Sequence, residues 1–487
     1  MRSNQVYIHE LINSKYPDKK DSFSPSIAFP EYKFPNDISN SENVVYEMIR
    51  ECLYHMGFDT EHYGLEDWNP LKGTIKPGDT VVLKANMVMH RNEKPEKGVE
   101  CLITHPSLVR AMIDYVVIAL KGTGAIIVGD APMQSCDFER LVEEQGYQKI
   151  IDFYHSKGIK VELVDFRNYK TISKNGLLQR VKNESNNKAI AVDLGKKSEF
   201  LSIDKNRYKK LRITNYDHSI IYNHHNSEKN EYLIAKKILD ADVIINMPKP
   251  KTHRKAGVTI SLKNLVGINT NKEWLPHHTE GSVKEGGDEY LSKSYLKKKR
   301  TYYLEKRDTY MVTGREGMAK VSGYIARGYS ILIRIFRKER NSEGSWYGND
   351  TIWRTILDLN KIVYFADKHG MMRDTRQRKM LIVADMIVSG EGEGPLLPDP
   401  KAVGMIAMGT NPVCFDEAIS SIMGFQPSFI PTIKNARKVK DYDFTDRKET
   451  KIVSNNTTYH NKRPKEVLYK DSLQFRPPAG WQGHFHK

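Results

Sequence analysis

The chain has 487 residues, 39% of them hydrophobic and 10% aromatic, so it can form a buried core and wholesale disorder is excluded. Lys and Arg number 76 against 60 Asp and Glu, and this net charge of +16 favours an anionic partner: nucleic acid, a phosphorylated metabolite or an anionic lipid. Four cysteines with no CxxC pair exclude a disulfide scaffold, a zinc ribbon and a ferredoxin-type cluster module.

The first half of the chain alternates strand and helix patterns. TVVLKANMVM (80–89) is typical of a strand, and the apolar spacing that follows Pro106 predicts a helix up to residue 120. The continuous apolar run AIIVGD (125–130) predicts a buried parallel strand, followed by a helix over about 137–156 and a strand at 161–166. This order is the beginning of a doubly wound α/β fold.

The second half resumes this order after a polar stretch, 167–235, in which only AIAVDL predicts a short antiparallel strand. The later predicted elements are a strand at 241–249, a helix at 351–367, strands at 380–390 and 403–410, and a helix at 412–423. We therefore predict a doubly wound α/β fold with a mostly parallel sheet, helices on both faces and a basic helical insertion.

The domain organisation follows from the same pattern. We expect an N-terminal lead-in (1–75), a composite α/β domain (76–270 and 350–430), a basic, partly helical insertion (271–349) and a charged C-terminal tail (431–487). With no long apolar segment and no secretory leader in the sequence, a cytoplasmic location is expected.

Much of the positive charge lies in one segment. Residues 293–340 hold fourteen Lys and Arg against four Asp and Glu. Lys320, Arg327, Arg334 and Lys338 form one helical stripe beside aromatic and aliphatic residues. Such a helix can lie on an anionic membrane surface, at the inner face of the membrane, or pack on the protein's own core with a solvated basic face. Nucleic acid is the less favoured partner, because no recognised nucleic-acid-binding pattern accompanies the charge.

Polar residues follow several predicted strands, and open α/β sheets bind ligands at the carboxyl ends of their strands. The stretch PKPKTHRKAGVTISLKNLVG (248–267) is the densest in cations, which predicts phosphate or carboxylate binding; a solvated loop is the alternative. The residues assigned to substrate binding are Lys84, Asn86, Lys249, Lys251, Lys263 and Asn264.

Acidic and histidine side chains complete the candidate site. The catalytic candidates are His105, Asp130 and His253, although His105 and Asp130 are equally suited to capping a helix. In the loop GEGEGP (390–395), Glu391 and Glu393 suit a divalent cation such as Mg, with Asp130 as a further ligand. Sugar hydroxyls and a solvated turn are the alternatives. The pair His277-His278 is interpreted as part of an exposed loop.

Five motifs together carry a family resemblance: KANM with Thr104-His105-Pro106, VGDAP, PKPKTHRKAGVTISLKNLVG, GEGEGP and NPVCFDEAISSIMGF. Over about 80–425 the chain resembles the family known as domain of unknown function 362. The resemblance implies an α/β fold with no settled reaction. Many members carry a ferredoxin-like iron–sulfur module, whose cysteines this chain lacks, so no iron–sulfur cluster is expected.

The resemblance also implies a set of site residues. The family's recurring polar residues fall here on Lys84, Asn86, His105, Asp130, Lys251, His253, Lys263, Asn264 and Asp416. The loop GEGEGP departs from the family's more usual GNGP-like form, with Glu393 in the Asn position. GSWYGNDTIWR (344–354) resembles a branch found beside surface-polysaccharide genes.

Three functions are open at this point. The first is a transferase- or hydrolase-type enzyme acting on an anionic substrate, phosphorylated or linked to a sugar or lipid, in surface-polysaccharide biosynthesis. The second is a redox protein in which Cys101, Cys136 and Cys414 converge on a metal or an iron–sulfur cluster. The third is a non-catalytic binding or scaffold protein of a polysaccharide assembly system.

Overall fold

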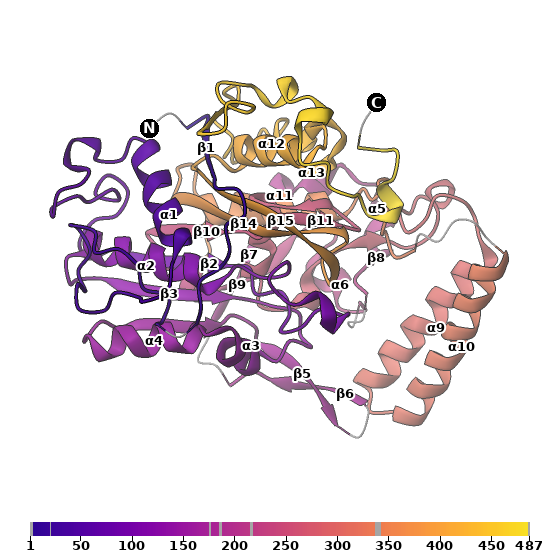
Figure 1. Cartoon of the computed structure of the whole chain (residues 1–487). Helices are drawn as coiled ribbons and strands as arrows, with labels where there is room; N and C mark the ends of the chain where they lie inside the picture. The colour runs from indigo at the N-terminus through magenta and orange to yellow at the C-terminus, as the bar shows by residue number, and fades with distance from the viewer. Residues whose placement is uncertain are drawn as a thin grey trace.

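The fold is built on one large sheet (Figure 1). The computed structural model describes residues 3–19, 21–174, 177–184, 188–214, 218–336 and 342–485. The strands of the sheet have the order β16-β1-β15-β14-β10-β2-β3-β4; in addition, β11 pairs with β14 and β12 pairs with β11. The strands are β1 (Gln5–Glu10), β2 (Thr80–Ala85), β3 (Ala125–Asp130), β4 (Val161–Asp165), β10 (Val243–Met247), β11 (Lys251–His253), β12 (Gly257–Thr259), β14 (Lys379–Glu393), β15 (Leu397–Gly409) and β16 (Lys451–Ser454).

Most strand pairs of the large sheet are parallel, as the sequence predicts. The five neighbours β14, β10, β2, β3 and β4 run in the same direction. The predicted strands at 380–390 and 403–410 are longer than expected and form an antiparallel hairpin, β14–β15, so the sheet is mixed on that side. Their apolar runs are continuous because both faces of the sheet are covered.

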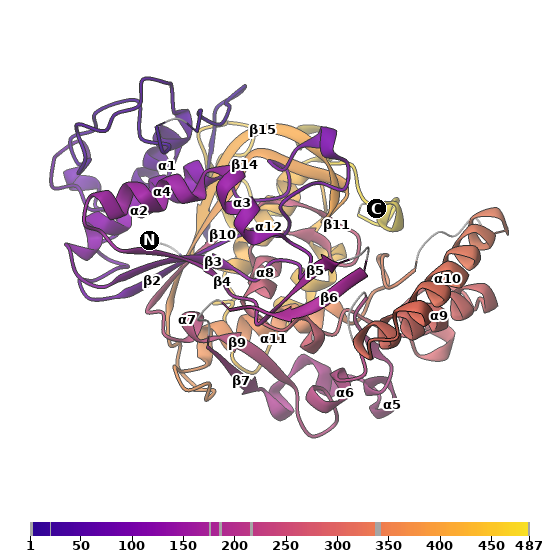
Figure 2. The same cartoon turned by 90° about the horizontal axis from the view of Figure 1, so that it is seen from below.

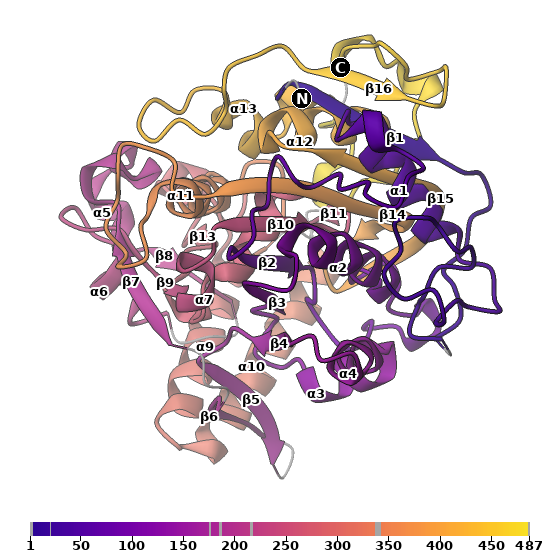
Figure 3. The ribbon, with the colours of Figure 1, turned by 90° about the vertical axis from the view of Figure 1, so that its left-hand side faces the viewer.

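Helices cover both faces of the sheet (Figure 3). Successive side chains of β2 point to opposite sides: Val81 and Leu83 pack with one hydrophobic cluster and Val82 with the other. The first cluster includes α1 (Val44–His55), α2 (Pro106–Leu120), α3 (Phe138–Gln145) and α4 (Tyr147–Ser156). The second includes α8 (Ser261–Asn264), α11 (Ile352–Phe365), α12 (Pro412–Met423) and α13 (Pro431–Ala436). The predicted α/β fold with helices on both faces is thus confirmed.

The single helix predicted over about 137–156 is two helices. Gly146, with φ of +87°, ends α3 and precedes α4, and a left-handed residue at this point suits glycine because a Cβ there is strained. The chain therefore changes direction between the two helices.

The polar stretch after β4 forms small antiparallel sheets and short helices. The predicted strand AIAVDL is β7 (Ala189–Asp193), which pairs with β9 (Glu231–Ala235). The other pairs are β5 (Tyr169–Lys174) with β6 (Leu177–Lys182) and β8 (Leu211–Arg212) with β13 (His278–Thr279). The short helices are α5 (Lys205–Tyr208), α6 (Ile221–His224) and α7 (Lys236–Leu239).

The basic segment forms a helical hairpin. Helices α9 (Tyr295–Val312) and α10 (Glu316–Phe336) pack against each other and stand away from the sheet and its covering helices (Figures 1 and 2). Lys338, the last residue of the predicted basic stripe, lies outside the described residues. In the part of the chain that the structure describes, no helix has the length and apolar character that a membrane crossing requires.

Both terminal segments join the central fold. Strand β1 lies between β15 and β16 in the sheet, so residues from the two ends of the chain are neighbours. Farther along, Trp481 is fully buried, and its indole Nε1 donates a hydrogen bond to the Arg254 carbonyl oxygen at 2.7 Å. A Cβ on Gly257 would lie 3.0 Å from the same ring. The C-terminal segment therefore fastens the hairpin formed by β11 and β12.

We predict that Trp481→Ala lowers the free energy of unfolding by about 3–5 kcal/mol, because it removes a fully buried ring and leaves a cavity. Leu468→Ala is the matched control: this side chain is 53% exposed, so its loss should change stability by less than about 0.5 kcal/mol. Denaturant unfolding of both variants measures the difference. Equal stabilities would contradict the anchoring role of Trp481.

Candidate functional site

A cavity of about 200 Å³ lies at the carboxyl ends of β2 and β3, beside the β11–β12 hairpin. Six residues selected from the sequence line it: Asn86, Asp130, Lys251, His253, Lys263 and Asn264. The lining has further charged or titratable residues: Arg254 and Lys255 from the same segment as Lys251, and Lys272, His277 and Glu343 from other segments. The structure thus brings together six of the eleven predicted site residues, from strands, a short helix and loops.

A buried ion pair forms the floor of this region. The Lys84 ammonium lies 2.8 Å from Asp130 Oδ1, and neither side chain is more than 6% exposed. Asp130 Oδ2 accepts a hydrogen bond from the Met87 backbone N–H at 2.7 Å. A Cβ on Gly267 would lie 1.9 Å from Asp130 Oδ1 and 2.8 Å from Lys84 Nζ. Only glycine fits at position 267 while this pair is in place.

A chain of amide side chains positions the next residues. Asn86 Nδ2 donates to Asn264 Oδ1 at 2.9 Å, and Asn264 Nδ2 donates to Asn246 Oδ1 at 2.8 Å. The remaining oxygen of the first amide, Asn86 Oδ1, accepts from Lys251 Nζ at 3.2 Å. Strands β2, β10 and β11 and helix α8 are therefore connected through buried hydrogen bonds, which fix the side-chain rotamers.

Asp416 holds the helix that carries Lys263. Its carboxylate accepts hydrogen bonds from the backbone N–H groups of Ser261 and Leu262, at 2.8 and 3.2 Å, and from the Ser261 hydroxyl. Burial raises the pKa of Asp416 to about 7. These contacts place α8 against α12, so the recurring Asp416 acts on the candidate site by positioning α8.

The lysines around the cavity are poorly solvated. Burial lowers the pKa of Lys251 and of Lys272 to about 7, and that of Lys255 and of Lys263 to about 8. Neighbouring positive charges act in the same direction: Lys84 and Lys255 both lower the pKa of Lys263. Lys272 was not selected from the sequence as a site residue, because the selection relied on polar residues at the ends of predicted strands and Lys272 follows an irregular segment. Its ammonium donates to the Ala131 carbonyl oxygen at 2.7 Å.

Two histidines of the cavity have different hydrogen-bonding roles. His253 Nδ1 accepts from the backbone N–H groups of Lys255 and Ala256, both at 3.1 Å, so the neutral ring carries its proton on Nε2. His277 Nδ1 lies 2.7 Å from the Leu275 carbonyl oxygen, so it donates and leaves Nε2 as a proton acceptor. Burial, followed by nearby lysines, lowers the pKa of both rings well below the usual range.

The interpretation of His277 and His278 as exposed loop residues is wrong. His278 is 3% exposed and belongs to β13, and His277 is half-buried and lines the cavity. The pairing of β13 with β8 carries both residues inward, and this contact between distant segments has no local sequence signal.

Lys249 and His105 lie in a separate buried cluster and do not line this cavity. The Lys249 ammonium is 2.6 Å from Asp385 Oδ2, and the same oxygen accepts from the His105 backbone N–H at 2.8 Å. His105 Nδ1 accepts from the Ser107 backbone N–H and so caps α2, while its ring stacks on Tyr16 at 3.9 Å. These contacts match the helix-capping alternative for His105.

The two glutamates of the GEGEGP loop contact the C-terminal segment. Glu391 Oε2 accepts from the Arg476 backbone N–H at 3.0 Å, and Glu393 Oε1 accepts from the Ala479 backbone N–H at 2.7 Å. Neither residue lines the cavity, although Pro395 of the same loop does. Among the described residues, no three His, Cys, Asp or Glu side chains form a group that could hold a metal ion.

The cysteines considered for a redox centre are on opposite faces of the sheet. Cys101 and Cys136 belong to the cluster beneath α1–α4, whereas Cys414, on α12, belongs to the cluster on the other face. All four cysteines of the chain are free and buried.

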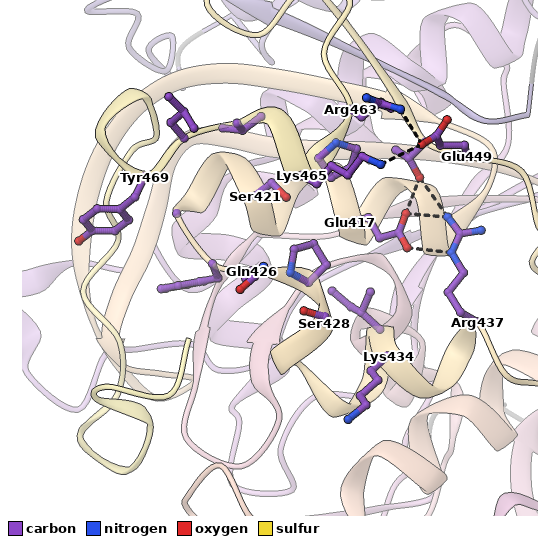
Figure 4. A pocket seen from close by; sticks show the side chains of 18 of the residues that line it. Glu417, Ser421, Gln426, Ser428, Lys434, Arg437, Glu449, Arg463, Lys465 and Tyr469 are labelled. Atoms are coloured by element: carbon purple, nitrogen blue, oxygen red, sulfur yellow. Dashed lines mark hydrogen bonds and ion pairs between the residues drawn. The ribbon is translucent and has the colours of Figure 1, made fainter. Parts of the chain in front are cut away.

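A larger cavity, of about 920 Å³, lies between α12, α13 and the C-terminal segment (Figure 4). None of the predicted site residues lines it. Several of its cations are neutralised by carboxylates of the same lining: Arg437 pairs with Glu417 at 2.6 Å and Arg463 with Glu449 at 3.3 Å. Its lysines are exposed to solvent, whereas Lys251 and Lys272 of the smaller cavity are buried.

The fold and the smaller cavity define an α/β protein with a cationic pocket at the carboxyl ends of parallel strands. The model of the family described as a domain of unknown function (DUF362) matches residues 81–194 and 183–421. The chain therefore belongs to this family, and the predicted resemblance is confirmed.

Two individual proteins are similar to the chain. A thylakoid-associated protein of Synechocystis sp. is 21% identical over 369 residues, which cover 76% of this chain and 70% of that protein. The crystal structure of a Thermotoga maritima protein aligns with a TM-score of 0.27 and 11% identity, over 74% of this chain and 54% of that one.

We predict that Gly267→Ala destabilises the protein by about 1–3 kcal/mol, because the new methyl group overlaps the Lys84–Asp130 pair and forces one side chain to move. Gly73→Ala is the control, since a Cβ at that position has no atom within 4 Å. Denaturant unfolding compares the two variants. A Gly267→Ala protein as stable as Gly73→Ala would show that the pair is not closely packed.

Proposed function

We propose that this protein is an enzyme that binds a phosphorylated or otherwise anionic small substrate in the lysine-lined cavity and acts on it by acid–base chemistry. The observation that carries the proposal is the charge balance of the lining. Lys251, Lys255, Lys263 and Lys272 surround the cavity. Its two carboxylates are already paired with cations that do not line it: Asp130 with Lys84, and Glu343 with Arg300 of α9.

A bound anion would remove the physical cost of this arrangement. Burying an ammonium group without a counter-ion is unfavourable, so such a lysine either loses its proton or acquires an anionic partner. The pKa values of about 7 for Lys251 and about 8 for Lys263 indicate that, without a bound anion, these lysines are close to losing their protons at neutral pH. Phosphate oxygens accept several hydrogen bonds from ammonium groups and would restore the protonated state.

The remaining groups of the lining supply the chemistry. His277 Nε2 is a proton acceptor and suits a general base, and the Nε2–H of His253 suits a hydrogen-bond donor to a leaving oxygen. Apolar side chains, among them Val88, Ile213 and Leu275, form another part of the wall. A sugar- or lipid-linked phosphate would meet both kinds of surface, and a divalent cation such as Mg would enter with the phosphate, beside Asp130.

A non-catalytic binding protein is the second candidate, because the same charge balance supports binding without turnover. Hydrolysis or transfer of a phosphate ester by the purified protein would favour the enzyme. Saturable phosphate binding with no turnover of phosphate esters would favour the binding protein.

We predict that inorganic phosphate binds the wild-type protein and that Lys251→Ala or Lys263→Ala weakens binding by about tenfold to 100-fold, the cost of losing one charge-assisted hydrogen bond. Lys368→Ala is the matched control, because that side chain is exposed and distant in sequence from the site. Isothermal titration calorimetry measures the affinities, and thermal unfolding confirms that each variant folds. Unchanged affinity in both site variants would refute the proposal.

The lowered lysine pKa values predict the pH dependence of binding. A bound anion raises these pKa values, so above about pH 7–8 binding must take up protons, whereas below this range the lysines are already charged. Affinity should therefore be greatest at low pH and fall at least about tenfold between about pH 6 and pH 9. Sulfate is the probe, because its own charge is constant over this range. Affinity that stays constant or rises with pH would contradict the prediction.

A further inference from the structure

Helix α10 has an unusually apolar exposed face. Tyr324 and Ile335 are 70% and 66% exposed, and Val321 is 58% exposed. Residues three, four and seven positions apart share one side of a helix. The apolar face of α10 is formed by Val321, Tyr324, Ile325, Ile331, Leu332 and Ile335. It extends over most of the helix, so it differs from the scattered exposed apolar residues of an ordinary surface.

This face is turned away from the rest of the hairpin. The buried residues of α10 are Ala319, Ser322, Ala326 and Ile333, which lie on the other side of the helix. On that side, Tyr329 stacks on Tyr303 of α9 with the ring centroids 5.9 Å apart, and Ser330 accepts a hydrogen bond from Arg300 Nε at 3.0 Å. Packing on α9 therefore uses one face of α10 and leaves the apolar face without a partner among the described residues.

A row of cations runs along one edge of the apolar face. Lys320, Arg327 and Arg334 are seven residues apart, all three are exposed, and none forms an ion pair with a carboxylate in the described part of the chain. The row and the apolar face are neighbours around the helix, because positions 320, 324, 327, 331 and 334 follow one another at helical spacing.

We propose that the α9–α10 hairpin docks on an anionic lipid bilayer, with the apolar face of α10 inserted at the level of the headgroups and Lys320, Arg327 and Arg334 bound to lipid phosphates. An amphipathic helix with a basic edge binds such a surface through buried apolar area together with electrostatic attraction. Charge complementarity is the reason to choose a bilayer: Lys320, Arg327 and Arg334 form no ion pair among the described residues, and anionic headgroups would provide their partners.

The shape of the hairpin suits contact with a flat lipid bilayer. In two views it stands off the body as a ridge (Figures 1 and 2), which presents a helix face to a flat surface. The base of the ridge adjoins the lysine-lined cavity: Arg300 of α9 is 2.7 Å from Glu343, which lines that cavity. The hairpin that carries the proposed docking face is therefore in direct contact with the wall of the cavity.

Vesicle sedimentation tests the docking. The wild-type protein should bind vesicles of about 30% phosphatidylglycerol in phosphatidylcholine at low salt, and binding should weaken at high salt because the charges are screened. The variant V321S/I325S/L332S/I335S removes apolar area at constant charge, and K320Q/R327Q/R334Q removes charge at nearly constant apolar area. We expect each to weaken binding by at least about tenfold.

Matched controls separate these effects from general ones. K205Q/K284Q/K368Q removes three exposed lysines elsewhere on the surface and should bind the vesicles as the wild type does. Sulfate binding in the cavity should be unchanged in all three variants, which shows that they are folded and separates failure of the docking proposal from failure of the proposed function. All substituted side chains are exposed, so no loss of folding is expected.

Three results would overturn the proposal. The first is wild-type protein that stays in the supernatant with anionic vesicles at low salt. The second is a four-serine variant that binds as tightly as the wild type. The third is a wild-type dimer, measured by light scattering without vesicles, that the four-serine variant abolishes; this result would assign the apolar face to a second copy of the chain.

Discussion

The candidate site depends on one buried ion pair, Lys84–Asp130, at the carboxyl ends of two adjacent parallel strands. Register alignment of β2 and β3 places Lys84 opposite Gly129, one residue before Asp130, so the sheet itself brings the two charges together. A charge buried in this way is tolerated only with a close partner. The pair in turn requires glycine at position 267, and Asp130 lines the cavity together with four lysines.

Because Asp130 is already paired, the cavity keeps an excess of positive charge. Burial lowers the pKa values of Lys251 and Lys272 toward neutrality, so these lysines can reduce the excess charge by losing a proton. A bound anion would balance the charge of the protonated lysines. The larger cavity near α12 differs in the exposure of its charges: its lysines are in contact with solvent, and two of its arginines pair with Glu417 and Glu449. Buried cations without a counter-ion, more than cavity volume, indicate where an anionic ligand would bind.

The hairpin formed by α9 and α10 shows the same principle at the surface. Lys320, Arg327 and Arg334 form no ion pair in the described part of the chain, and they lie beside apolar side chains of α10 that lack a packing partner there. The sequence indicated a basic amphipathic helix but left two orientations open, one against the protein core and one toward a membrane. Only the packing of Ala319, Ala326 and Ile333 on α9 shows that the more apolar face of α10 is the exposed one.

The sequence by itself determined the alternation of strands and helices, the family and six of the residues that line the cavity. The spacing of apolar residues and the position of a polar residue after a strand are local properties, so both can be recognised in the sequence. Parallel strands end at one edge of the sheet, so Asn86, Asp130 and Lys251 were predicted together. Tertiary structure decided which of the predicted polar residues contact partners outside the cavity. Asp385 pairs with Lys249, the C-terminal segment binds Glu391 and Glu393, and β8 carries His277 inward. Each partner is distant in sequence, and no local pattern records a contact of that kind.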